Sequence, residues 1–223
     1  MRYALFFSFM LVLTACKKNQ DNNIIYGYEY YPSDSGAYVS YNVVEILHDD
    51  LAGVHDTDYY QIKEIIGEED VDLEGEIFKK VYRYKRLSET LPWSLQDVWV
   101  MKKSNRSVEL VEENQRKIKM AFSISYDQYW DCNALNEEDE VICYYRNIYQ
   151  PLNLNNESFD STVVVEQEND LNFIHYTRSF EVYAREIGKI QYYHKDFDIN
   201  EGDTLQAIKG NELFYTVFEY GKE

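Results

Sequence analysis

The stretch from His48 to Asp58 holds the first group of side chains suited to chemistry. It brings two imidazoles and four carboxylates together, in the segments His48-Asp49-Asp50 and His55-Asp56-Thr57-Asp58. Zinc binds imidazole and carboxylate groups, and calcium binds carboxylate oxygens. Nothing in the spacing fixes a coordination geometry, however, and solvated hairpin ends are often acidic. We therefore interpret residues 48–58 as an acidic loop between two strands.

A second acidic stretch begins at Asp196 and is similar to the start of a calcium loop. Asp196, Asp198 and Asn200 supply oxygen ligands at alternate positions. An EF-hand loop continues with Gly at its sixth place and a bidentate Glu at its twelfth. This chain has Glu201 and Ala207 there. The segment is predicted to be a polar turn between strands. No metal ligand and no cofactor are predicted, and metal binding by the acidic stretches 48–58 and 196–203 is left open by the sequence.

The sequence contains few other residues or motifs that are typical of catalytic sites. It contains only 4 His, and it lacks the Gly-x-Ser-x-Gly, His-Glu-x-x-His and phosphate-loop motifs. His175 and His194 lie in strand-like segments among aromatic residues, where a hydrogen-bonded structural His is commoner than a catalytic base. Pairs of carboxylates are frequent, but 40 acidic residues make chance pairs inevitable. No catalytic residue is predicted, and the protein is expected not to be an enzyme.

The N-terminus has the layout of a signal peptide. Arg2 is followed by an apolar segment that reaches Leu13, with small residues just before Cys16. This segment is about half of the ~20 residues that a membrane span needs. The ending Leu13-Thr14-Ala15-Cys16 resembles the lipobox of bacterial lipoproteins, which implies that residues 1–15 are removed and that acyl chains such as palmitate are attached to Cys16. An ordinary secretory signal is the alternative.

Residues 16–25 are polar after Cys16 and are predicted to form a flexible tether between lipid and fold. Lys17 follows the Cys, and by resemblance to the lipoprotein sorting rule this favours the outer membrane. Both the periplasmic and the surface-facing side remain open. The expected location is therefore the outer membrane, with the protein lipid-anchored through Cys16.

The net charge of the protein excludes some classes of binding partner. The chain has 22 Lys and Arg against 40 Asp and Glu, a formal net charge of −18. Phosphates are repelled by such a surface, so no nucleic-acid partner is expected. Attachment to anionic lipid through the protein surface is excluded for the same reason. We expect membrane contact only through the N-terminal lipid.

The two Cys that remain, Cys132 and Cys143, flank a polar turn around Glu138. An even pair in an oxidising compartment is typical of a disulfide. A bridge that closes a loop of this size contributes roughly 3 kcal/mol to stability. Two free thiols are the alternative, and the bridge is the prediction.

Period-two alternation dominates the chain and predicts strands. It is clearest at Ile118, Met120, Phe122 and Ile124, which bury one strand face. Further strands are predicted at 37–47, 59–66, 77–87, 97–102, 108–112, 142–149, 161–167, 173–184, 187–193 and 213–220. Residues 26–223 are therefore predicted to be one mainly β domain, with few or no helices outside the signal peptide. A single curved antiparallel sheet and two packed sheets (a sandwich or half-barrel) are both compatible with this pattern.

Several segments together resemble a known group of proteins. They are Tyr28-Glu29-Tyr30-Tyr31-Pro32, Tyr60-Gln61-Ile62-Lys63-Glu64, Pro92-Trp93 with Val98-Trp99, Glu112-Glu113-Asn114, and Glu181-Val182-Tyr183-Ala184 with Ile187-Gly188. The series resembles an uncharacterised family of predicted lipoproteins from Bacteroidota-type Gram-negative bacteria. The resemblance implies a periplasm-facing or surface domain on the outer membrane, and it transfers no catalytic residue. The Cys132 and Cys143 pair is not part of the family pattern.

Tyr is the compositional outlier, with 22 Tyr beside 11 Phe and 3 Trp. A Tyr side chain offers an apolar ring and a hydrogen-bonding hydroxyl, which suits contact with a glycan or peptide. We expect a non-catalytic binding or accessory domain that contacts an envelope protein or a glycan or peptide ligand. The alternative is an enzyme acting on envelope glycans or peptides. A binder predicts an exposed aromatic patch, and an enzyme predicts a concave pocket with perturbed pKa values.

Overall fold

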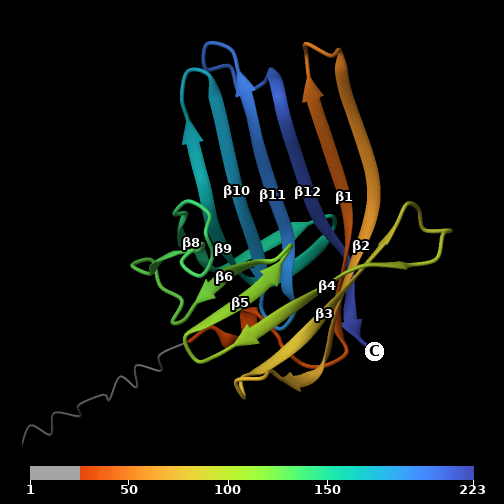
Figure 1. The fold of residues 1–223 in the computed structure, drawn as a ribbon, viewed down its shortest axis with the longest axis vertical. Helices are drawn as coiled ribbons and strands as arrows, with labels where there is room; N and C mark the ends of the chain where they lie inside the picture. The colour runs from red at the N-terminus through yellow and green to blue at the C-terminus, as the bar shows by residue number, and fades with distance from the viewer. Residues whose placement is uncertain (1–25) are drawn as a thin grey trace, which may run out of the picture.

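The computed structural model describes residues 26–223, which form one antiparallel sheet of twelve strands (Figure 1). The elements are a 3₁₀ turn at Tyr28–Tyr30 and strands β1 (Ala37–Asp49), β2 (Val54–Val71), β3 (Ile77–Arg86), β4 (Ser94–Lys103), β5 (Ser107–Glu112), β6 (Gln115–Ala121), β7 (Tyr129–Asp131), β8 (Ile142–Leu154), β9 (Glu157–Leu171), β10 (His175–Ala184), β11 (Gly188–Ile199) and β12 (Ala207–Lys222). The predicted signal peptide, Cys16 and the tether lie outside the described residues.

Strands that are neighbours in the sheet are also neighbours in sequence, except that β1 pairs with β12. The strand order therefore ends at β6 on one side and at β7 on the other. These two edges approach each other: the amide of Ile118 donates to the carbonyl of Cys132 at 2.9 Å, and Trp130 Nε1 donates to the carbonyl of Ile118 at 2.9 Å. The predicted mainly β fold is confirmed, as a single curved and nearly closed sheet.

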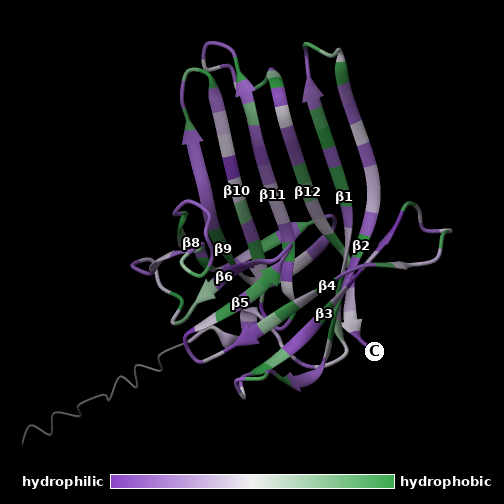
Figure 2. Cartoon of the chain, viewed as in Figure 1, coloured by the Kyte–Doolittle hydropathy of each residue, from purple (hydrophilic) through white to green (hydrophobic). Residues whose placement is uncertain are grey.

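Apolar and polar residues are interleaved along the strands, as the hydropathy colours of Figure 2 show. One core cluster contains Trp99 and Met101 of β4 together with Tyr145 of β8 and Val165 of β9. These strands lie in opposite halves of the strand order. Burial of their apolar side chains therefore holds the two halves of the curved sheet against each other.

The first described residues close one end of the molecule. Tyr30 is completely buried, and its hydroxyl is hydrogen-bonded to Ser161. The ammonium group of Lys103 donates to the carbonyls of Tyr28 and Tyr31, at 3.0 and 2.7 Å. Figure 1 shows this segment at the end opposite the β1–β2, β9–β10 and β11–β12 hairpin ends. No helix within 26–223 has the length and apolar character needed to cross a membrane.

Several predicted boundaries are wrong: the strand predicted through Phe122 and Ile124, for example, ends at Ala121. The acidic loop at 48–58 is only a short turn, because β2 already begins at Val54. The polar turn predicted from Asp196 is strand instead, since β11 continues to Ile199. In both cases pairing with a neighbouring strand overrides the low strand propensity of Asp. Strand β8 also continues past Pro151, where the register of its pairing with β9 shifts, and Pro is tolerated in a sheet at such irregularities.

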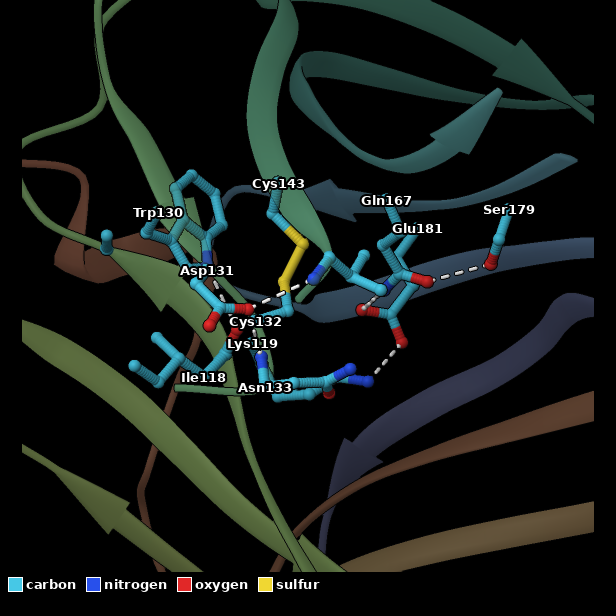
Figure 3. The surroundings of a disulfide bond; sticks show 12 residues. Ile118, Lys119, Trp130, Asp131, Cys132, Asn133, Cys143, Gln167, Ser179 and Glu181 are labelled. Carbon is cyan, nitrogen blue, oxygen red and sulfur yellow. Dashed lines mark hydrogen bonds and ion pairs between the residues drawn. A yellow bond between two sulfur atoms is a disulfide. The ribbon is translucent and has the colours of Figure 1, made fainter. Parts of the chain in front are cut away.

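Cys132 and Cys143 are joined by a disulfide, with their Cα atoms 5.9 Å apart. The amide of Cys132 donates to the carbonyl of Val141 at 2.8 Å, which closes the loop between β7 and β8. Figure 3 shows that Lys119, Glu181 and Gln167 lie next to this bridge. The bridge therefore fixes the edge of the sheet beside a group of buried polar side chains.

Candidate functional site

Charged side chains of alternating sign form a continuous series of ion pairs inside the curved sheet. In order, they are Asp97, Arg83, Glu64, Lys189, Glu181, Lys119 and Glu112, with successive nitrogen–oxygen distances between 2.9 and 3.9 Å. We call these seven side chains the charge chain. They come from β4, β3, β2, β11, β10, β6 and β5, so the charge chain links strands from both halves of the sheet.

The centre of the charge chain is withdrawn from water. Glu181 is 2% exposed and Lys119 is 8% exposed. Burial alone would raise the pKa of the Glu181 carboxyl, but the ammonium groups of Lys119 and Lys189 outweigh it and hold that pKa below its ordinary value. Burial likewise disfavours the charged form of Lys119, yet Glu112 and Glu181 raise its pKa well above the ordinary value. Both groups are therefore charged at neutral pH.

Neutral side chains complete the hydrogen bonding of the buried charges. The Tyr183 hydroxyl donates to Glu181 Oε2 at 2.7 Å, and Gln167 Nε2 donates to the same oxygen at 3.1 Å. The Tyr41 hydroxyl donates to Glu64 Oε2 at 3.5 Å and to the backbone carbonyl of Lys189 at 2.9 Å. Part of the Tyr excess therefore lies inside the sheet, where hydroxyl groups support buried charges.

Two polar cavities, of about 210 and 280 Å³, lie beside the charge chain. Both are lined by Glu112, Lys117, Lys119, Glu138 and Tyr192, so their walls are shared. We call the two together the polar pocket. The larger cavity is close to the lower end of the ~300–1,000 Å³ range of small-molecule sites.

Trp99 lines the larger cavity and is 8% exposed. The guanidinium of Arg83 lies over its ring, 4.4 Å from the centroid. Trp99 Nε1 is buried and has no hydrogen-bond partner among the described residues. An unsatisfied buried donor costs about 1–3 kcal/mol, so this N–H lowers the stability of the fold.

A third cavity, of about 60 Å³, shares Lys119 and Lys189 of the charge chain with the larger cavity of the polar pocket. It is largely apolar and is lined by Tyr31, Val39, Ile66, Val81, Met101, Leu110 and Tyr183 together with Glu64, Lys119 and Lys189. The three charged residues face both this cavity and the remainder of the charge chain. The charge chain thus lies between this small apolar cavity, which we call the apolar floor, and the polar pocket.

The structure brings His48 and His55 together as a cross-strand pair of β1 and β2. Their Nδ1 atoms are 3.2 Å apart, while His48 Nε2 is 2.9 Å from Glu212 and His55 Nε2 is 2.8 Å from Asp50. Each ring therefore has both nitrogens engaged. Among residues 26–223, no group of three or more His, Cys, Asp or Glu side chains is arranged to hold a metal ion.

His175 and His194 both lie in strands, as predicted, but in different surroundings. His175 contacts Asp196 and Asp198 at 2.9 and 3.1 Å, and the hydrogen bond to Asp198 raises its pKa. His194 lines the smaller polar cavity, and burial lowers its pKa. His194 Nδ1 is buried without a hydrogen-bond partner in the described chain.

Some of the exposed apolar side chains lie at three neighbouring hairpin ends. They are Leu51, Leu171, Phe173, Ile174 and Leu205. Backbone hydrogen bonds connect these ends: the amide of Gly202 donates to the carbonyl of Phe173 at 3.0 Å, and that of Ile199 to Ile174 at 2.9 Å. Four of these five side chains are aliphatic, so the hairpin ends do not form an aromatic surface, and the exposed Tyr59, Tyr126 and Tyr129 lie elsewhere.

Sequence reasoning missed the polar pocket. Lys119 separates the alternating apolar residues Ile118 and Met120 in the sequence, where the pattern indicates no role for it, whereas the structure buries it between two carboxylates. Trp99 and Glu181 were noted only as parts of a family resemblance. The sequence did contain a local signal for the pair of Glu112 and Lys119, because these residues lie on the two strands of one short hairpin. Glu181, the other partner of Lys119, lies far away in sequence, and no local pattern indicates that contact.

Comparison with known proteins gives no match: no protein-family model, no curated protein and no solved structure matches this chain. The class that the fold and the site define is a curved single-sheet domain with a preformed polar pocket. What the pocket does must therefore be inferred from its own geometry.

We predict that Lys119→Met will lower the free energy of unfolding by about 3–5 kcal/mol, because Glu181 and Glu112 lose the ammonium group between them while Glu181 stays buried. Urea unfolding of the purified protein measures this. Lys117→Met is the matched control on the same strand. Lys117 pairs with Glu138 where both are partly exposed, so its loss should cost less than about 1 kcal/mol. Equal losses for the two variants would contradict a structural role for the charge chain.

We also predict that His175 and His194 will give opposite pH dependences. The raised pKa of His175 stabilises the fold below the unfolded value of about 6.5, and this contribution is lost as pH rises through the folded pKa. His175→Gln should therefore cost up to about 1 kcal/mol more at pH 5.5 than at pH 9. The lowered pKa of His194 penalises folding as pH falls below 6.5, so His194→Gln should cost less at pH 5.5 than at pH 9. Urea unfolding at both pH values compares them, and the same sign for both variants would contradict the assignment.

Proposed function

We propose that this protein is an outer-membrane lipoprotein, anchored through acyl chains on Cys16, whose domain is a non-catalytic binding module. The ligand occupies the polar pocket on the concave side of the sheet. The lipobox-like ending at Cys16 and the acidic surface support attachment through lipid alone. The binding role is supported by a pocket that is already formed, with its polar groups in place.

One observation carries the choice of binding over catalysis. A general acid or base works best with a pKa near the working pH. In the charge chain the pKa of Glu181 is lowered and that of Lys119 is raised, so both move away from neutrality. Such groups do not exchange protons readily near pH 7. They present fixed charges, which suit orientation of a ligand.

The competing function is an enzyme that acts on envelope glycans or peptides. His194 favours it most, because a lowered pKa keeps its ring neutral and Nδ1 is unpartnered. A nucleophile activated by this ring is not in place, however. The hydroxyl of Ser179, in the same cavity, donates instead to Gln167 Oε1 at 2.8 Å. This arrangement again favours binding.

Cys16→Ala is expected to abolish incorporation of an alkyne-labelled fatty acid into the protein, because the acylated thiol is removed. The domain should then appear in the soluble periplasmic fraction or as an uncut precursor at the inner membrane. Click detection of the label and fractionation of cells measure both. Cys143→Ala serves as the control and should keep the label. Continued labelling of Cys16→Ala would refute the anchor.

Leu213→Trp should abolish binding in the polar pocket, because Leu213 lines the larger cavity and a larger side chain fills it. Native mass spectrometry of the full chain, mixed with a small-molecule extract of the cell envelope, is expected to show a bound compound that is released unchanged. The control is Leu95→Trp at an exposed position of β4 outside the pocket, which should keep the ligand. Release of a chemically altered compound would favour the enzyme instead.

A further inference from the structure

We propose that His48 and His55, at the β1–β2 hairpin end (Figure 1), bind one divalent transition-metal ion through their Nδ1 atoms. Neither residue lines the polar pocket, so this site does not depend on the binding function proposed above. The two rings face each other as a cross-strand pair, with Nδ1 atoms 3.2 Å apart. Two nitrogen ligands of one tetrahedral zinc ion, each about 2.0–2.1 Å from the metal, lie roughly 3.3–3.4 Å apart. The observed separation is therefore close to that of two ligands of one ion.

The hydrogen bonds of the two rings direct a lone pair of each ring toward the other. His48 Nε2 is 2.9 Å from Glu212 Oε1, and His55 Nε2 is 2.8 Å from Asp50 Oδ1. An ionised carboxylate only accepts hydrogen bonds, so each Nε2 carries a proton and each neutral ring has its lone pair at Nδ1. Two lone pairs at 3.2 Å repel each other unless a cation lies between them. A metal ion supplies that cation and bonds to both nitrogens.

The two carboxylates match the surroundings of metal-binding histidines. Such a His usually donates its other N–H to a carboxylate, which fixes the tautomer and makes the bound nitrogen more basic. Glu212 is itself held in place, because it is 8% exposed and its Oε2 is 2.7 Å from the ammonium of Lys195. The ring of His48 also packs against that of Phe197, with centroids 6.0 Å apart. His48 is therefore oriented before a metal arrives.

The ligand atoms decide which metals bind. Imidazole nitrogens suit copper, nickel and zinc, and copper binds such nitrogens most tightly, whereas calcium and magnesium require oxygen ligands. The net charge of −18 attracts cations of all these kinds to the protein. Among residues 26–223, no further His, Cys, Asp or Glu side chain extends the pair to a group of three ligands. A metal at this site therefore keeps coordination positions for water or for a donor group of another molecule.

Isothermal titration calorimetry of the full-length protein in detergent measures the binding. The protein is purified without a polyhistidine tag and treated with iodoacetamide, so that neither a tag nor a free thiol binds metal. Copper, nickel, zinc, calcium and magnesium chlorides are titrated in a buffer that does not bind metals. We expect one copper, nickel or zinc ion per chain, with copper bound most tightly and no binding of calcium or magnesium at the same concentrations. Electron paramagnetic resonance of the copper complex should show splitting by two nitrogen nuclei.

His48→Gln and His55→Gln each remove one ligand. Loss of a hydrogen-bond partner of a metal ligand already costs about 10–100-fold in affinity, so loss of a ligand should cost at least about tenfold. The side chain of His55 is 54% exposed, and circular dichroism of its variant should show an intact fold. His175→Gln is the matched control, because His175 contacts the carboxylates of Asp196 and Asp198 rather than a second imidazole. This variant should keep the affinity and the two-nitrogen signal.

The outcomes decide the proposal without involving the polar pocket. Binding of one transition-metal ion that both ligand variants weaken and His175→Gln does not supports the site. Absence of transition-metal binding overturns it, and the two rings then share only a proton. Binding that His48→Gln and His55→Gln leave unchanged also overturns it, because the metal then occupies another site. Equal affinity for calcium would overturn the imidazole ligands. The ligand test with Leu213→Trp is independent of all these results.

Discussion

The ion pair between Glu64 and Lys189 shows the main constraint on this fold, which is that a curved sheet must enclose paired charges. Glu64 is on β2 and Lys189 is on β11, and β1 and β12 lie between them in the strand order. In a flat sheet these strands would be about 14 Å apart, because neighbouring strands are spaced by about 4.8 Å. The two side chains nevertheless meet at 3.6 Å. Because side chains stand roughly perpendicular to a sheet, these two converge where the sheet curves toward its enclosed face, and charges enclosed in this way are stable only when they are paired.

The link between sheet curvature and charge pairing explains why the interior of the sheet is both polar and ordered. A sheet that curves around its own side chains usually fills the enclosed space with apolar groups. Here apolar clusters do so around Trp99 and Tyr41, while the charge chain occupies a layer between the apolar floor and the polar pocket. The molecule therefore carries an acidic exterior and, at its centre, charges of both signs in close balance. A preformed interior of this kind keeps its polar groups oriented before any ligand arrives.

Much of the fold was predictable from the sequence, and much of the site was not. Alternation of apolar residues, as at Ile118 and Met120, reports a strand directly, because side chains point to opposite faces in turn. The Cys132–Cys143 pair was predictable from parity and compartment. Which face of a strand is enclosed depends on curvature, and curvature depends on distant strands. The burial of Lys119 against Glu181, on β10, therefore had no local signature.

The pairing of β1 with β12 has a consequence for how the chain acquires its structure. Ala37 faces Lys222 and Asp49 faces Lys209, so the first strand is matched to the last along its whole length. Consecutive hairpins can form as soon as their two strands are available, but this central seam cannot close before residue 222 has been made. Until then β1 and β11 each present an unpaired edge, which favours contact with other chains. Completion of the sheet is thus tied to completion of the polypeptide, and a chain that stops before β12 leaves open the two edges that β12 covers in the finished protein.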